Sequence, residues 1–208
     1  MRVFTTPWLL TKLFPQIMWR SPEVLPPGEK VIYLTFDDGP VPEATPFVLE
    51  TLAKYGALGT FFCVGDNAAR YPQLIKDTRQ AGHGHGNHTF NHLNGWQTTP
   101  QAYLQNIEKC RRVLPSRLFR PPYGKIAPAQ YRLLRKEYKI VLWDVVSYDF
   151  DSALSAGDCL SELKARVTSG SIVVFHDSIK AMKNLREVLP AALVYWSALG
   201  YSFRKIEG

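Results

Sequence analysis

The sequence predicts an α/β fold, a distorted (β/α) barrel of about seven parallel strands with outer helices. Short runs of β-branched and aromatic residues alternate about seven times with segments of helical periodicity along the 208 residues. The connections are short, which favours parallel strands joined by right-handed crossovers. Polar residues stand where successive strands end. In a barrel these ends meet on one rim, whereas an open sheet would separate the first from the last.

The first half of the chain contains the strand around which the rest is organised. Residues 31–36 form an apolar run, too short for a helix and rich in β-branched residues, that ends at two aspartates and Gly-Pro. Adjacent carboxylates at a strand end repel each other unless a cation or a proton compensates; the alternative is a solvated turn. The next predicted elements are a helix over 46–53, a strand over 58–64, a helix over 71–80 and a Gly-rich histidine segment over 82–88 that ends the third strand.

The second half of the chain continues the same alternation. Apolar residues recur at helical spacing in four segments, and β-branched runs separate them. The predicted helices cover 101–114, 127–138, 156–167 and 185–199, the last interrupted or offset at Pro190. The predicted strands cover 116–120, 140–146, 171–175 and 201–206.

Composition indicates one folded domain and argues against a nucleic-acid partner. Hydrophobic residues make up 46% of the chain, which is ordinary for a protein with a sizeable core. The formal charge of +7 is dispersed, because no run of Lys and Arg exceeds two residues. Cys63, Cys110 and Cys159 show no C-x-x-C spacing, so we expect reduced, mostly buried thiols.

Residues 1–29 form an extension ahead of the predicted catalytic domain, 30–208. The extension has no apolar stretch long enough to span a bilayer and no signal-peptide cleavage pattern. Its aromatic residues and leucines, with basic residues between them, fit either packing against the domain or peripheral contact with a membrane. This pattern favours a cytoplasmic or membrane-peripheral location over secretion.

Two histidines in H-T-F-N-H are candidate metal ligands. His88 and His92 are four residues apart, so on a helical turn both imidazoles would project from the same face. A carboxylate from Asp37 or Asp38 would complete a site with open positions. Such donors suit one divalent cation, Zn²⁺ first and Co²⁺, Ni²⁺ or Mn²⁺ in its place. The alternative is a pair of exposed histidines without a metal.

Other residues near predicted strand ends also carry chemistry. Arg120 precedes two prolines in R-P-P-Y-G, which fix the backbone that delivers its guanidinium and the amide of Tyr123. This loop either holds a carboxylate and stabilises an oxyanion or is a structural turn. His176 follows an apolar strand, where an imidazole serves as an acid near pH 7 or as a core residue. We expect His83 and His85 to pack and hold the Gly-rich turn.

The motifs T-F-D-D-G-P, H-T-F-N-H, R-P-P-Y-G and V-V-F-H-D resemble, in order and spacing, those of the polysaccharide deacetylase family, the NodB-homology domain of carbohydrate esterase family four. The resemblance covers residues 30–206 and implies a distorted (β/α) barrel that acts as a metal-dependent deacetylase on N-acetylated sugars. By position it implies these roles: Asp37 as general base held by Arg120; Asp38, His88 and His92 as metal ligands; Tyr123 as oxyanion donor through its backbone N–H; His176 as general acid; and Thr89 as the residue that ties down the histidine loop.

One departure from the family pattern concerns the support of His176. The family has D-x-x-D-W where this chain has V-S-Y-D-F over 146–150. Valine thus replaces the aspartate that supports the catalytic histidine in the family. We therefore expect a lowered pKa for His176, with Asp149, or Asp144 reaching from the strand, as a partial substitute.

The sequence thus predicts a hydrolase that removes N-acetyl groups from a glycan substrate. Phe150 and Val174 would line a small acetyl pocket, and Trp96 and Tyr148 would either stack on a sugar ring or pack. Two other functions fit the same residues. One is an O-acetyl esterase or small-amide deacylase on the same fold, and the other is a carbohydrate-binding protein with weak catalysis.

Overall fold

The computed structural model describes residues 2–208. The strands in this range are β1 (Lys30–Asp37), β2 (Gly59–Cys63), β3 (Gly84–Asn87), β4 (Leu118–Phe119), β5 (Lys139–Ile140), β6 (Val145–Val146), β7 (Ile172–His176) and β8 (Tyr201–Phe203). The helices are α1 (Trp8–Leu13), α2 (Thr45–Ala53), α3 (Gly65–Arg70), α4 (Pro72–Gln80), α5 (Pro100–Val113), the 3₁₀ turn η1 (Pro122–Gly124), α6 (Pro128–Leu134), α7 (Ala156–Arg166) and α8 (Met182–Ala198).

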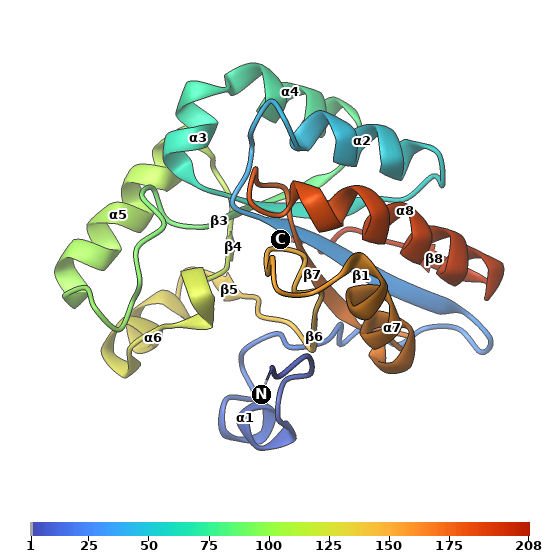
Figure 1. Cartoon of the computed structure of the whole chain (residues 1–208). Helices are drawn as coiled ribbons and strands as arrows, with labels where there is room; N and C mark the ends of the chain where they lie inside the picture. The colour runs from blue at the N-terminus through green and yellow to red at the C-terminus, as the bar shows by residue number, and fades with distance from the viewer. Residues whose placement is uncertain (1) are drawn as a thin grey trace.

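The strands form one curled parallel sheet. They pair in the order β5-β4-β3-β2-β1-β7-β6, and every pair in this row is parallel. β8 pairs in parallel with the N-terminal end of β1, outside the row. The helices surround the sheet, with α2 to α4 on one side and α7 and α8 on another (Figure 1). The predicted distorted (β/α) barrel of about seven parallel strands is confirmed.

β1 lies at the centre of the sheet and determines where the polar residues gather. Every residue of the strand from Val31 to Asp37 is buried, because β2 pairs on one side and β7 on the other. This explains an apolar run without polar alternation. The register places Asp37 level with Phe62 of β2 and His176 of β7. Residues that end these strands therefore share one rim.

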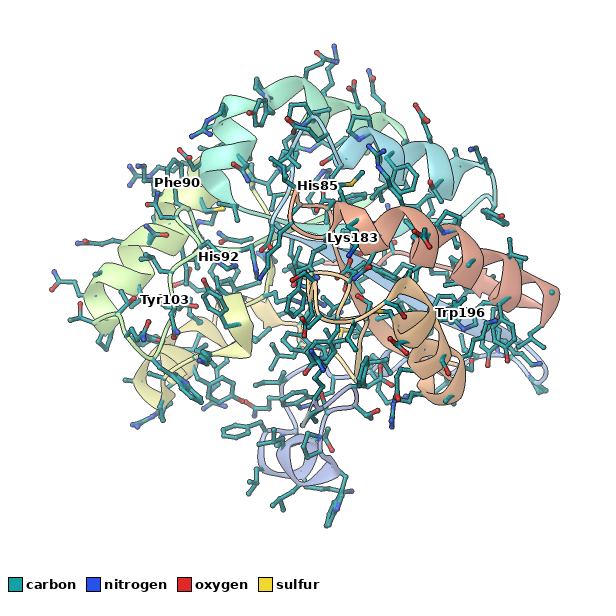
Figure 2. All side chains as sticks on the ribbon, in the orientation of Figure 1. His85, Phe90, His92, Tyr103, Lys183 and Trp196 are labelled. Atoms are coloured by element: carbon teal, nitrogen blue, oxygen red, sulfur yellow. The ribbon has the colours of Figure 1, made fainter. Side chains whose placement is uncertain are left out.

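The main core lies between the sheet and the outer helices. Phe36 stacks with Phe61 and Phe175 across β1, β2 and β7, with ring centroids 5.0 Å and 6.0 Å apart. Trp196 of α8 adds a large buried side chain, and Figure 2 shows it far from His92. Cys63, Cys110 and Cys159 are buried and form no disulfide bond, as predicted.

The N-terminal extension lies against both edges of the row of strands. Met18 pairs with Val141, next to β5, and Thr5 pairs antiparallel with Val145 of β6. Helix α1 projects beyond these contacts (Figure 1) and buries none of its own residues. Among residues 2–208, no helix combines the length and apolar character needed to cross a bilayer.

The strand predicted over 140–146 is two short strands, β5 and β6. Between them the backbone bonds partly to neighbouring strands and partly to the N-terminal extension. The N–H of Val141 donates to the carbonyl of Phe119 in β4, and the N–H of Asp144 donates to the carbonyl of Ile172 in β7. The N–H of Leu142 donates to the carbonyl of Met18, and the N–H of Thr6 donates to the carbonyl of Asp144. An apolar run predicts burial, but it does not reveal which partner takes its hydrogen bonds.

The helix predictions need three corrections. The helix predicted over 127–138 ends at Leu134, and the short helix α3 was not predicted. The last helix is not interrupted: α8 runs unbroken through Pro190. A proline inside a helix costs about 3 kcal/mol. The buried apolar face of α8 offsets this cost, because each buried large apolar side chain contributes about 1.5–3 kcal/mol.

Candidate active site

A pocket of about 360 Å³ opens where the central strands end. Part of its lining is polar and part is apolar. The polar residues are Asp37, Asp38, His88, His92, Tyr123, His176 and Lys180. The apolar and aromatic residues are Val3, Trp143, Val146, Tyr148, Phe150 and Val174.

Asp38, His88 and His92 bring three donor atoms together in this pocket. One side-chain ligand atom of each residue lies within 4.8 Å of the other two. Oδ1 of Asp38 lies 3.1 Å from Nε2 of His92 and 3.7 Å from Nε2 of His88. Two imidazole nitrogens and a carboxylate oxygen fit zinc or a related divalent cation and leave positions for water or substrate. Of the two aspartates that the sequence left open, Asp38 is the one that joins the histidines.

The two histidines lie on an irregular loop between β3 and α5, so the predicted helical turn is wrong. Thr89 and His92 adopt left-handed backbone conformations, with φ of 62° and 54°, which a helix excludes. The hydroxyl of Thr89 accepts from the N–H of Leu93 at 3.0 Å, and the N–H of Thr89 donates to the Asn87 side chain at 2.8 Å. These bonds fix the loop that directs both imidazoles toward Asp38.

Hydrogen bonds also determine which nitrogen of each imidazole is available. Nδ1 of His88 donates to the backbone carbonyl of Arg120 at 2.8 Å, so Nε2 keeps its lone pair. Nδ1 of His92 lies 3.1 Å from the hydroxyl of Tyr123. Burial lowers the pKa of His88 to about 4, so its ring is neutral at pH 7, as a metal ligand must be. Outer partners of this kind orient metal-ligating histidines.

A buried arginine holds Asp37 at the edge of the pocket. Nη1 of Arg120 donates to Oδ1 of Asp37 at 2.6 Å and to the hydroxyl of Thr35 at 2.8 Å. Its Nε and Nη2 donate to the carbonyls of Val141 and Leu142 at 3.2 Å and 3.0 Å. Arg120 is fully buried, and a buried charge requires such complete pairing. Arg120 thus places a positive charge beside the Asp37 carboxylate and fixes the orientation of that carboxylate, next to the residues that could bind a cation.

His176 has a carboxylate partner despite the valine in the family motif. Its Nδ1 donates to Oδ1 of Asp149 at 2.8 Å, and its backbone N–H donates to Oδ2 of Asp149 at 2.8 Å. Burial opposes the charged ring, but the nearby Asp149 carboxylate raises the pKa of His176 to about 9. The predicted lowering of this pKa is therefore wrong. Asp144 takes no part, because it accepts from Arg20 and Ser171 instead.

The apolar lining agrees with the sequence analysis only in part. Phe150, Val174 and Tyr148 line the pocket. Trp96 does not: it is 67% exposed, and its indole N–H donates to the carbonyl of Ile126 at 3.2 Å. No local pattern marks the lining residues that the sequence analysis did not assign, which are Val3, Trp143, Val146 and Lys180.

Asp177, a residue that the sequence analysis left without a role, holds the turn after β1. Its carboxylate accepts from the N–H of Gly39 at 3.1 Å and from the hydroxyl of Thr45 at 2.7 Å. A Cβ on Gly39 would lie 2.0 Å from Oδ2 of Asp177, so only glycine fits. Burial raises the pKa of Asp177 to about 8. In the sequence, the signals that could have indicated this role are the dipeptides Gly39-Pro40 after the first strand and His176-Asp177 after the sixth predicted strand.

His83 and His85 pack against neighbouring elements, as expected. Nδ1 of His83 accepts from the N–H of Gly59 at 3.1 Å. Nε2 of His85 lies 2.6 Å from the hydroxyl of Thr78. Neither residue belongs to the group of donors around Asp38.

Comparisons with known proteins agree with this geometry. Residues 25–141 match the family model described as polysaccharide deacetylase. A peptidoglycan-N-acetylglucosamine deacetylase of Bacillus cereus is 33% identical over 186 residues, covering 86% of this chain and 87% of that protein. A chitooligosaccharide deacetylase of Azorhizobium caulinodans is 34% identical over 158 residues, covering 72% and 75%.

A solved structure extends the likeness to the whole fold. The crystal structure of a peptidoglycan N-acetylglucosamine deacetylase is similar with a TM-score of 0.86 at 26% identity. The likeness covers 97% of this chain and 95% of that chain, so it includes most of the N-terminal extension. Since the family model matches more than half of the residues and the relatives match most of the length, the chain belongs to the polysaccharide deacetylase family.

Proposed function

We propose that the protein is a metal-dependent deacetylase that hydrolyses the amide bond of N-acetyl groups on a glycan. The observation that carries this proposal is one pocket in which the donors of Asp38, His88 and His92 lie together with Asp37 and His176. An amide is a poor electrophile with a poor leaving group, so its hydrolysis needs an activated water, a base and an acid. This pocket holds side chains for each of these tasks.

Asp38, His88 and His92 would hold the cation, most simply Zn²⁺, with Co²⁺, Ni²⁺ or Mn²⁺ as substitutes. When bound, such an ion lowers the pKa of water and polarises a carbonyl. Asp37 accepts a proton from the attacking water. Arg120 holds the Asp37 carboxylate in a fixed direction, because its Nη1 donates a charge-assisted hydrogen bond to Oδ1 at 2.6 Å.

Two further groups act on the substrate in this proposal. His176 protonates the departing amine nitrogen, and the raised pKa means that the ring carries its proton at pH 7. The backbone N–H of Tyr123 stabilises the negative charge that develops on the carbonyl oxygen. A donor in that position contributes about 10² to 10³ in rate.

The names of the relatives support an N-acetylglucosamine residue as the acetylated sugar. One relative is named for peptidoglycan N-acetylglucosamine and another for chitooligosaccharides. These two glycans share the same acetylated sugar unit. We therefore propose a glycan that contains N-acetylglucosamine as the substrate class.

An acetate-release assay tests this function. The metal-stripped protein is incubated with N-acetylglucosamine oligomers, peptidoglycan, O-acetylated xylan and small acetamides, with and without added Zn²⁺. We expect metal-dependent acetate release from the first two substrates and loss of release on chelation. Release only from xylan or only from small amides would instead support the esterase or small-amide deacylase. Glycan binding without acetate release under any metal would support the binding protein.

The N-terminal extension supports a further proposal about partners, a peripheral contact with an anionic membrane. Consecutive turns of the segment expose large apolar side chains, namely Trp8, Leu9, Leu10, Leu13 and Phe14. Lys12 adds a positive charge, and residues 2–22 include no acidic residue, whereas Arg2 and Arg20 pair with Asp151 and Asp144. An apolar surface flanked by positive charge is complementary to anionic lipid headgroups above an acyl layer.

Vesicle sedimentation tests this contact. Vesicles of phosphatidylcholine with phosphatidylglycerol should carry the protein down, and vesicles of phosphatidylcholine alone should carry less. Trp8→Ser with Leu13→Ser should abolish the difference. Val24→Ser with Val194→Ser, which changes two exposed valines elsewhere, is the matched control. Equal sedimentation of both double variants would contradict the proposal.

A further inference from the structure

The first residues of the chain form part of the pocket wall. Residues 2–6, which we call the N-terminal strap, run antiparallel to β6 along its free edge. The N–H of Val146 donates to the carbonyl of Phe4 at 3.0 Å, and the N–H of Thr6 donates to the carbonyl of Asp144 at 2.9 Å. Backbone hydrogen bonds therefore fix the strap to the domain at Phe4 and at Thr6.

Side-chain bonds fasten the strap further. The hydroxyl of Thr6 donates to the carbonyl of Trp143 at 2.6 Å. Nε of Arg2 forms an ion pair with Asp151 at 2.6 Å. The strap thus brings Val3 into the lining of the same pocket as the cation ligands, although more than thirty residues of sequence separate them.

Tyr148 is the residue that the strap holds most directly. Its hydroxyl accepts from the N–H of Val3 at 3.2 Å and donates to the carbonyl of Val3 at 3.3 Å. The ring of Phe4 packs on Tyr148 with centroids 4.7 Å apart. The backbone of Tyr148 is left-handed, with φ of 56°, a conformation that costs about 1–3 kcal/mol outside glycine and persists only where contacts enforce it.

From Tyr148 the contacts continue to His176. The Tyr148 ring lies 5.6 Å from the ring of Phe150, and Phe150 lies 4.7 Å from the imidazole of His176 in an edge-to-face arrangement. Asp149, between the two aromatic residues in sequence, holds Nδ1 of His176. The strap, Tyr148 and Phe150 therefore form one packed side of the pocket, and that side ends at His176.

We propose that the N-terminal strap, through Tyr148 and Phe150, determines the size of the acyl group that the pocket admits beside His176. This inference rests on the proposed deacylation. A pocket of about 360 Å³ holds on the order of ten water-sized groups. An acetyl group fills only part of it, so the position of this apolar side decides whether a longer acyl chain also fits. Phe4 and Tyr148 are positioning residues in this account.

Two variants of the full chain loosen the strap without touching the groups that act on the amide. Phe4→Ala removes the ring that packs on Tyr148, and Tyr148→Phe removes the hydroxyl that bonds Val3. For each variant we measure kcat and KM on N-acetyl, N-propionyl and N-butyryl glucosamine oligomers. We expect the selectivity for acetyl over butyryl to fall by about tenfold or more, because one methylene in a fitted apolar pocket changes specificity by about 10- to 200-fold.

A binding experiment provides a readout that does not depend on turnover. Zinc-loaded protein is titrated calorimetrically with acetohydroxamic, butyrohydroxamic and hexanohydroxamic acids. The two variants should bind the longer acids more tightly relative to acetohydroxamic acid than the natural protein does. Phe4→Tyr keeps an aromatic ring against Tyr148 and should restore the original ratio.

Phe14→Ala is the matched control. Phe14 belongs to the same extension and packs edge-on against Tyr131, but it does not line the pocket. Its selectivity should equal that of the natural protein. Unchanged acyl ratios in folded Phe4→Ala and Tyr148→Phe would overturn the strap proposal while the deacetylase activity stands. Absence of acetate release from the natural protein would instead remove the proposed function, and the hydroxamate ratios would still decide the role of the strap.

Discussion

The polar and apolar sides of the pocket are built in different ways. On the polar side, Asp37, Asp38 and His88 follow directly from central strands whose register fixes them. The guanidinium of Arg120 makes four hydrogen bonds to buried partners, each at 3.2 Å or less. The apolar side depends on the strap and on a left-handed tyrosine. Changes on the polar side should therefore abolish function, and changes on the apolar side should retune it.

The largest expected effect comes from removing a cation ligand. His88→Ala should eliminate stoichiometric zinc and reduce deacetylation by about a thousandfold or more, about 4 kcal/mol of barrier. His85→Ala is the matched control, because His85 lies in the same Gly-rich segment and contacts Thr78 instead. Zinc content by mass spectrometry and acetate release check both variants. Full zinc occupancy in His88→Ala would show that the cation lies elsewhere.

The next effect is on stability and comes from Arg120. Arg120→Met leaves the buried Asp37 carboxylate without its partner, which should lower the free energy of unfolding by about 3–5 kcal/mol. Arg111→Met removes an exposed arginine paired with Glu108 and should cost less than about 1 kcal/mol. Chemical denaturation measures both. Equal losses of unfolding free energy in the two variants would contradict the claim that the buried Arg120–Asp37 pair stabilises the polar side more than an exposed ion pair does.

A smaller effect concerns pH. Asp149 raises the pKa of His176 to about 9, so the protonated acid is present at pH 7 and lost as pH rises through that value. The stability from this pair is likewise complete below about pH 6.5, the ordinary histidine pKa, and lost on the alkaline side. In Asp149→Asn, the pH at which kcat falls on the alkaline side should be lower by at least about one pH unit. Asp66→Asn, a change at an exposed carboxylate, should leave it in place.

The smallest effect is expected from Tyr123. Tyr123→Phe removes the hydroxyl 3.1 Å from Nδ1 of His92 and keeps the backbone N–H. Outer-shell changes of this kind reduce metal affinity by about 10- to 100-fold. Competition with a fluorescent chelator gives the zinc affinity. Tyr131→Phe, on α6, is the control, and a matching affinity in the two variants would rule out a role for the Tyr123 hydroxyl.

The polar side could be predicted because its residues stand in short motifs at strand ends. Once β1 was recognised as a buried central strand, a parallel sheet required Asp37, Asp38 and His176 to share a rim. The Arg120 loop follows the same logic, since its two prolines fix its direction. Such positions depend on local pattern and strand order alone.

The rest depends on long-range contacts or on unusual backbone conformations. Helical spacing gave the wrong geometry for His88 and His92, because left-handed residues within the loop are not visible in a pattern of residue types. The sequence analysis expected Asp149 to support His176 only in part. The left-handed turn at Tyr148 places the Asp149 carboxylate in hydrogen-bond contact with Nδ1 of His176, and a pattern of residue types does not reveal this turn. Val3 lines the pocket because the N-terminal strap pairs with β6. No local sequence pattern predicts this long-range pairing.

The most direct test of the central claim is an anomalous diffraction map at the zinc edge from crystals grown with Zn²⁺. We expect one strong peak about 2.0–2.2 Å from Nε2 of His88, Nε2 of His92 and a carboxylate oxygen of Asp38. A map with no peak at this position, or with its strongest peak on other residues, would contradict it.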